Sequence, residues 1–196
     1  MGLAIDPGIT GTGEAWTPPL VGDNYARIQA CGKSFARGIF KFHDSVSGPK
    51  ATKFLNDAFD FGDKVAPFAF DWLGRQYCII DASMGKSGEP EVALIDPFDM
   101  SLEPLVQKGE FLGFLSSPVM LELVEQPLFD QWLSSAKINS VAFDQCAGAI
   151  QPAFLGGERT VENLELSDIE VYWPVMTQAA AAAAPLAEGE KLDSVS

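Results

Sequence analysis

The pattern of apolar and polar residues over the first sixty positions predicts two helices that flank a short strand. Apolar residues recur at close to helical spacing after Asn24, which suits a helix N-cap, and this helix is expected to end at Gly38. These apolar positions are Tyr25, Ile28, Cys31 and Phe35. Ile39–Phe42 alternates as a strand does, and Ser47-Gly48-Pro49 carries the start signal of a second helix. The glycines and prolines before Asn24 indicate an extended lead-in over residues 1–23.

The middle of the chain predicts strands that are joined by turns. Gln76–Asp81 and Glu91–Asp96 read as successive strands, and the glycine-rich loop between them favours a hairpin. Asp96-Pro97 makes the next turn, after which Leu102–Val106 is expected to form a third strand. Val65–Leu73, which precedes these strands, is interpreted as an aromatic-rich connection.

Short helices are expected next, followed by an extended run. The expected helices are Glu110–Leu115, Val119–Val124 behind the Ser117-Pro118 start signal, and Leu128–Leu133. Val141–Ile150 is interpreted as extended. Local strand pairs with helices segregated around them indicate an α+β fold, in which a mainly antiparallel sheet packs against helices.

The segment from Ala153 to Gln178 combines a backbone turn with a negative surface. Gly156 and Gly157 fit a turn that a β-carbon would obstruct. The acids after this turn are interleaved with apolar residues and stand against a single base, Arg159, so the segment can bury one face and keep the other negative. These acids are Glu158, Glu162, Glu165, Asp168 and Glu170. Such a surface suits a positively charged partner.

Charge is distributed unevenly along the 196 residues. The formal net charge is −14; residues 1–75 hold 8 basic and 8 acidic residues, whereas residues 76–196 hold 5 and 19. This field opposes binding to nucleic acid and to anionic membranes and favours a cationic partner, although an acidic surface also serves solubility alone. We recognise neither a signal peptide nor an apolar run long enough to span a membrane, and we therefore expect a cytoplasmic protein.

Residues that carry catalysis or bind metals are scarce. The three cysteines are far apart among apolar neighbours and are expected to be buried reduced thiols. His43 is the only histidine, which argues against a histidine-based metal cluster, and it is interpreted as structural rather than catalytic. We predict no catalytic residue, no cofactor and no metal. A small hydrolase that uses a carboxylate pair stays open as an alternative, because the pairing and burial of acids cannot be read from sequence.

The run Leu155–Leu164, LGGERTVENL, resembles the C-terminal signature of the immunity proteins that protect bacteria from their own type VI secretion DNase effectors. Upstream, Gly38–Phe42, Pro67–Gly74 and the Asp96-Pro97 turn are similar to the GAD-like N-terminal half of that family. The resemblance divides the chain into the lead-in 1–23, a GAD-like half 24–106, an immunity half 107–178 that is compact with it, and an alanine-rich tail 179–196.

This resemblance implies a compact α+β fold of the SMI1/KNR4-like group and a non-catalytic protein that binds and neutralises a nuclease toxin. Residues of the family pattern are expected to be structural, namely Gly156, Gly157, Val161, Asn163, Leu164, Trp72 and Gly74. Pro174 is expected to begin or kink the C-terminal helix of the family, and the alanines after Gln178 favour helix.

Contacts to a basic nuclease are expected from the acids between Glu158 and Glu170, with Asp96, Asp99 and Glu103 as a second group. For each of these acids the alternative is a merely solvated position. A second hypothesis is an SMI1/KNR4-like binding or regulatory module whose partner is another toxin or a different protein. The sequence leaves the oligomeric state open.

Overall fold

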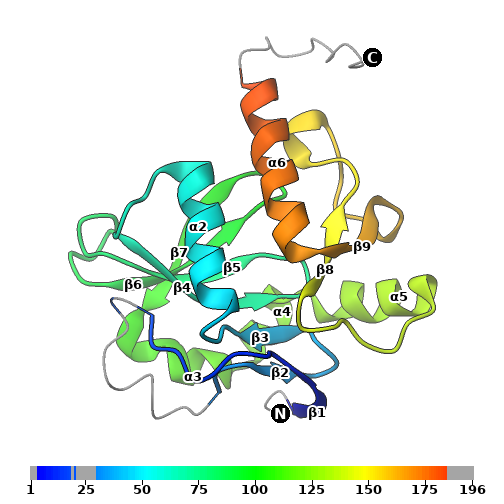
Figure 1. The fold of residues 1–196 in the computed structure, drawn as a ribbon, viewed down its shortest axis with the longest axis horizontal. Coiled ribbons are helices and arrows are strands. Elements are labelled where there is room, and N and C mark those ends of the chain that lie inside the picture. The colour runs from blue at the N-terminus through cyan, green and yellow to red at the C-terminus, as the bar shows by residue number, and fades with distance from the viewer. Residues whose placement is uncertain (1–3, 19, 21–29, 185–196) are drawn as a thin grey trace.

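A computed structural model describes residues 4–18, 20 and 30–184 of the chain. Its largest element is a seven-stranded antiparallel sheet whose strand order is the order of the strands in the sequence (Figure 1). The strands are β1 (Ile5–Thr10), β2 (Lys33–Phe35), β3 (Phe40–Phe42), β4 (Val65–Asp71), β5 (Gln76–Ile80), β6 (Glu91–Asp96) and β7 (Ser101–Gln107). A separate antiparallel pair consists of β8 (Gln145–Ala149) and β9 (Leu164–Asp168).

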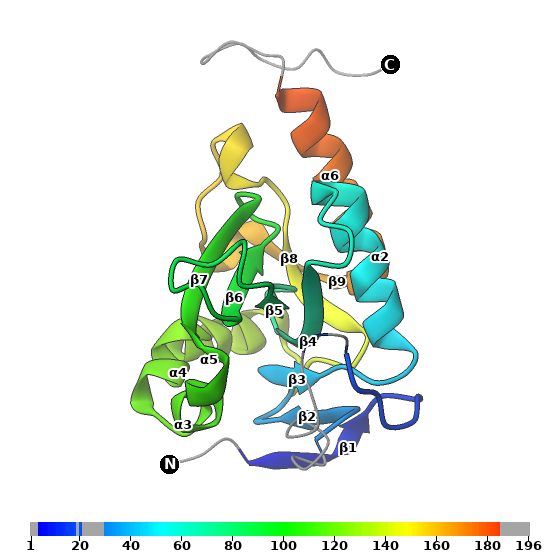
Figure 2. The same ribbon diagram turned by 90° about the vertical axis from the view of Figure 1, so that its left-hand side faces the viewer.

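Helices lie on both sides of the large sheet. They are α2 (Ser47–Phe59), α3 (Phe111–Leu115), α4 (Pro118–Leu123), α5 (Gln126–Ala136) and α6 (Ile169–Ala183), with 3-10 turns η1 (Lys108–Glu110), η2 (Ala153–Leu155) and η3 (Val161–Asn163). Figure 2 shows the strands between α2 and α6 on one side and the short helices α3–α5 on the other. The predicted α+β fold with a mainly antiparallel sheet is therefore confirmed. In the described part of the chain, no helix combines the length and apolar character needed to cross a membrane.

Two hydrophobic clusters cover the two faces of the sheet. Along β5, Tyr77 and Ile79 belong to one cluster, whereas Cys78 and Ile80 belong to the other. This strict alternation is what a strand with two buried faces requires, because successive side chains point to opposite sides. Both clusters also contain residues from beyond position 107. The two predicted halves, 24–106 and 107–178, therefore share their core.

The aromatic stretch from position 65 is a buried strand, β4, and the predicted connection is wrong. All seven of its residues are buried between β3 and β5. Its pairing with β5 is irregular between Pro67 and Ala69, which interrupts the two-residue alternation that would have marked it as a strand. With both faces covered, the segment also has no polar positions to reveal a period.

The predicted helix after Asn24 is wrong where it can be compared with the structure. Asn24, Tyr25 and Ile28 lie outside the described residues, but residues 33–35 form β2 between β1 and β3. The turn after β2 is held by the Asp6 carboxylate, which accepts hydrogen bonds from the backbone N–H groups of Arg37 and Gly38. Within the predicted extended lead-in, Ile5–Thr10 forms β1 and pairs with β2, whereas residues 1–3, 19 and 21–23 lie outside the described residues.

Three buried indoles connect segments that are distant in sequence. Trp72 Nε1 donates to the Val124 carbonyl at 2.7 Å, Trp132 Nε1 to the Leu164 carbonyl at 3.2 Å, and Trp173 Nε1 to the Gly74 carbonyl at 2.8 Å. A buried indole N–H needs such an acceptor, and here each acceptor is a backbone carbonyl that cannot move independently of its element. The bonds of Trp72 and Trp173 connect the end of α4 and helix α6 to the β4–β5 turn of the sheet, and the bond of Trp132 connects α5 to β9.

The C-terminal helix begins five residues before Pro174, so the expectation that it starts at the proline is wrong. The Asp168 carboxylate accepts a hydrogen bond from the Glu170 backbone N–H and caps the helix at its N-terminus. Helix α6 continues through Pro174 to Ala183, and it includes most of the alanine run. Residues 185–196 of the predicted tail lie outside the described residues.

Candidate functional site

The loop between β8 and β9 is held by side-chain and backbone contacts that involve the glycine pair. Gly156 adopts φ +82°, and a β-carbon on Gly157 would lie 1.9 Å from the Gln151 carbonyl oxygen. The Asn163 amide donates to the Gln151 and Glu158 carbonyls at 2.7 and 2.9 Å, and its oxygen accepts from the Gln151 N–H at 2.9 Å. These residues therefore set the path of the loop.

Replacing Asn163 with alanine is expected to lower the free energy of unfolding by about 2 kcal/mol, because three hydrogen bonds are lost together. Urea denaturation followed by circular dichroism measures the change. Glu162→Ala, at the exposed neighbouring position, is the matched control and should change stability by less than about 0.5 kcal/mol. Equal losses for the two variants would contradict the role assigned to Asn163.

The loop positions Arg159 between two carboxylates from other parts of the chain. Its guanidinium donates to Asp96 Oδ2 at 2.6 Å and to Glu125 Oε1 at 2.8 Å, and it lies over the Phe98 ring with 4.6 Å to the centroid. Burial opposes the charge of Arg159, but its interactions with the Asp96 and Glu125 carboxylates together outweigh burial and raise the pKa of the guanidinium. Arg159 is thus a fixed cation that joins this loop to the end of β6 and to the start of α5.

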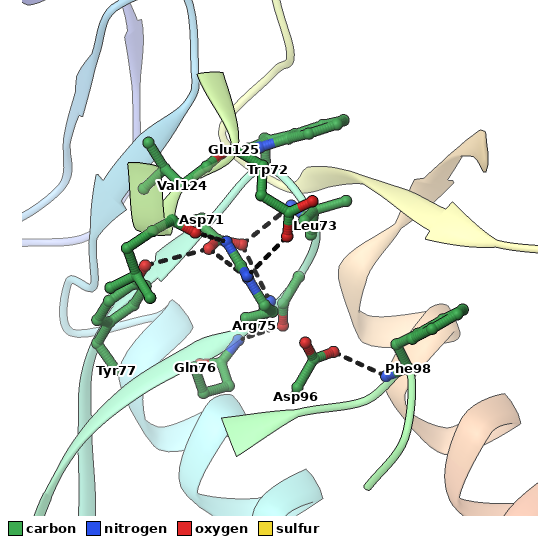
Figure 3. Close-up of polar contacts among 12 residues, drawn as sticks. Asp71, Trp72, Leu73, Arg75, Gln76, Tyr77, Asp96, Phe98, Val124 and Glu125 are labelled. Atoms are coloured by element: carbon green, nitrogen blue, oxygen red, sulfur yellow. Dashed lines mark hydrogen bonds and ion pairs between the residues drawn. The ribbon is translucent and has the colours of Figure 1, made fainter. Parts of the chain in front are cut away.

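A second arginine extends the ion pairs into the core. Arg75 Nε donates to Asp71 Oδ2 at 2.7 Å, and its two terminal nitrogens donate to Glu125 Oε1 at 3.1 Å and to the Leu123 carbonyl at 2.7 Å. Figure 3 shows Arg75, Leu73 and Tyr77 converging on the Asp71 carboxylate. Burial raises the pKa of Asp71, and the Arg75 guanidinium opposes this rise.

A groove of about 350 Å³ opens beside this network. Arg75, Asp96 and Arg159 lie along it with the apolar side chains of Leu94, Phe98 and Leu123, and the exposed acids Asp99 and Glu103 also line it. Glu158, which is exposed, neighbours Arg159 in the chain. The structure therefore places the second predicted group, Asp96, Asp99 and Glu103, at the groove, whereas the segment of the first group contributes Arg159 to it.

The predicted acids differ in how available they are to a partner. Asp96 is 8% exposed and neutralised by Arg159, so its main interaction is internal. Asp168 caps α6, and Glu170 forms an ion pair of 2.6 Å with Lys50 and lines a different cavity. Glu162 and Glu165 are exposed on η3 and β9. Asp99 and Glu103 are the predicted acids that are both exposed and part of the groove lining.

Sequence reasoning missed Arg75 and Glu125 as members of this network. Arg159 is the only base of its segment, which was the one available signal that it meets carboxylates. The signature residues behave as structural ones: Val161 packs against the core, Leu164 is buried, and a β-carbon on Gly74 would touch Cys146 and Tyr172.

His43 is a buried residue with both ring nitrogens in hydrogen bonds, to Ser47 Oγ at 3.0 Å and Gln76 Oε1 at 2.9 Å. Burial lowers its pKa to about 4, so the ring is neutral at pH 7. A base this weak is poorly matched to proton transfer at neutral pH. Cys78 and Cys146 are buried and unbridged, and Cys31 is half-buried.

Comparisons with known proteins identify a fold and no family. The sequence matches no model of a known protein family, and no curated protein matches it. Among solved structures, it is similar to the crystal structure of Atu4351 from Agrobacterium tumefaciens, with a TM-score of 0.62 and 14% sequence identity. The match covers 88% of this chain and 85% of the other. At this identity the likeness supports the α+β fold alone, because one fold serves many functions.

Proposed function

We propose that this chain is a cytoplasmic immunity protein that binds and neutralises a cognate type VI secretion DNase effector in a stoichiometric complex without chemistry of its own. The groove beside Arg159 carries the proposal. Its exposed acids, Asp99 and Glu103, stand beside a network that is already ion-paired, so their charges are directed outward. A nuclease needs positive charge along the path of its DNA backbone, and carboxylates held in place can occupy that path.

Two further observations support a cationic partner. The whole net charge of −14 lies after position 75, so the field of the molecule attracts a basic protein and accelerates the encounter. Fixed ion pairs below the groove also reduce the entropy that is lost when a partner binds, because Arg159 and Asp96 are ordered beforehand. The resemblance of LGGERTVENL to the immunity signature is what selects a nuclease among basic partners.

The test is co-expression with the toxin that is encoded next to this gene. We expect the two proteins to co-purify, and we expect this chain to restore growth and suppress DNA cleavage. If the neighbouring toxin is a nuclease and neither complex nor rescue is found, the proposal is wrong. Recovery of a non-nuclease partner would instead favour an SMI1/KNR4-like binding module, which the shared scaffold also allows.

Reversing the two exposed charges of the groove is expected to weaken the complex about tenfold or more, mainly through slower association. The variant is Asp99→Lys with Glu103→Lys, and surface plasmon resonance at two salt concentrations measures the rate and its salt dependence. Asp63→Lys with Glu89→Lys is the matched control, since both acids are exposed and lie at the opposite end of the sheet. Equal weakening by the two pairs would show that net charge, rather than the groove, governs binding.

A further inference from the structure

A second cavity, of about 550 Å³, lies away from the groove, between the N-terminal strand, the start of α2 and the loop before β8. Its size falls within the range of roughly 300–1,000 Å³ that is typical of ligand pockets. The walls combine polar side chains with aromatic and aliphatic ones. They include the side chains of Phe54, Phe70, Phe143 and Ile169. None of the residues in the groove beside Arg159 contributes to this cavity.

The cavity contains a buried carboxylate without a counter-cation. Asp44 is 1% exposed and accepts hydrogen bonds from the backbone N–H groups of Gly13, Val46 and Ser47, at 2.8, 3.0 and 2.8 Å. Burial opposes its ionisation, but the hydrogen bonds outweigh burial and lower the pKa of Asp44. Among the described residues no ion pair involves Asp44, and buried charges in proteins are usually paired.

None of the other charges at the cavity forms a direct ion pair with Asp44 among the described residues. Asp144 is exposed on the wall and, within the described chain, also forms no ion pair. Lys50 is neutralised by Glu170 at 2.6 Å. Lys41 is the nearby buried cation, and its ammonium donates to the backbone carbonyls of Ala142 and Gln145 rather than to Asp144. Of the charged side chains that line the cavity, Asp44, Asp144 and Glu170 are acidic and Lys50 is basic, so the lining carries an excess of negative charge.

We propose that this cavity binds a guanidinium or ammonium group on an apolar stem, supplied by a basic side chain of a partner protein or by a small organic amine. The carboxylates of Asp44 and Asp144 attract the cationic head. The apolar side chains of the wall, among them Phe143 and Ile169, cover the stem. The proposal uses none of the groove residues, so it stands independently of the nuclease.

The test compares two ligands of the same shape that differ in charge. Butylguanidinium and its neutral counterpart butylurea are titrated into the ¹⁵N-labelled full chain, and amide shifts are followed by NMR. We expect butylguanidinium to move the amides of Gly11, Phe143 and Ile169 saturably, with at least about fivefold tighter binding than butylurea. Equal binding of the two ligands, or shifts confined to other regions, would overturn the proposal.

Asp144→Asn tests the charge without disturbing the buried hydrogen bonds of Asp44. It is expected to weaken butylguanidinium about threefold or more and to leave butylurea unchanged. Asp99→Asn, in the groove beside Arg159, is the matched control and should bind both ligands as the parent does. Unchanged butylguanidinium affinity in Asp144→Asn would refute the role of the carboxylates.

The same measurement in the complex with the neighbouring toxin distinguishes the two sources of the cation. If a basic side chain of the toxin fills the cavity, the complex protects the Gly11 and Phe143 amides, and Asp144→Asn weakens the complex. If butylguanidinium still titrates these amides within the complex, the natural ligand is a small amine. Because the free chain is titrated first, the cavity can be tested even if the toxin does not bind.

Discussion

Replacing Arg75 with methionine is expected to lower the free energy of unfolding by about 3–5 kcal/mol. Arg75 is 3% exposed and Asp71 is fully buried, so the substitution leaves a carboxylate without its cation in the core. The Leu123 carbonyl loses its donor as well. Urea denaturation at pH 7, followed by circular dichroism and tryptophan fluorescence, measures the loss.

Two further variants separate burial of charge from loss of packing. Arg37→Met breaks an ion pair with Asp130 in which both side chains are about half exposed, and it should cost less than about 1 kcal/mol. Adding Asp71→Asn to Arg75→Met removes the stranded charge and should recover at least about 1 kcal/mol. No recovery in the double variant would mean that the buried charge is not the cause.

The stability of the protein is expected to rise with pH between about 7 and 10.5 through Lys41. Its side chain is fully buried, and burial lowers the pKa to about 7 from the ordinary 10.5. Within this window the unfolded chain holds the lysine proton more tightly than the folded chain does, so each increase in pH favours the folded state. At pH 7 and below, this contribution is lost.

Comparing the free energy of unfolding of the parent with that of Lys41→Met isolates this effect. Thiols and tyrosines titrate in both proteins, so their contributions cancel in the difference. The stability of the parent relative to Lys41→Met should increase by about 5 kcal/mol across the window. Lys64→Met, at an exposed lysine, should follow the parent at every pH. If the curves of stability against pH for the parent and Lys41→Met stay parallel from pH 7 to 10, Lys41 remains protonated in the folded protein and the prediction is wrong.

The elements that could be predicted from sequence are those that local residues determine. The hairpin of β5 and β6, the strand β7 and the short helices α3–α5 each carry their own period or start signal, and the structure confirms them. Strands β4 and β2 were missed because partners distant in sequence determine them. Pro67 lies at an irregularity of a strand that is covered on both faces, and Lys33–Phe35 pairs with residues 23 to 30 positions earlier.

The candidate site could be predicted only as a set of acids. Exposure distinguishes Asp99, Glu103 and Glu158 from Asp96, and exposure depends on tertiary packing. Arg159 and Asp96 are 63 positions apart, and no local pattern connects them. The network through Arg75 and Glu125 was equally hidden, because a base and an acid 50 positions apart look solvated in any sequence pattern.

The order of strands in the large sheet has a consequence for synthesis on the ribosome. Every strand from β1 to β7 pairs with its neighbour in the sequence, so each can join the sheet soon after it is translated. Such nearest-neighbour pairing also shortens the loops that must close, which favours rapid folding for a sheet of this size. The last third of the chain, with Arg159 and Trp173, then closes over a frame that is already assembled. The groove needs Arg159 from this last part of the chain, so it is completed only after all seven strands of the sheet have been synthesised.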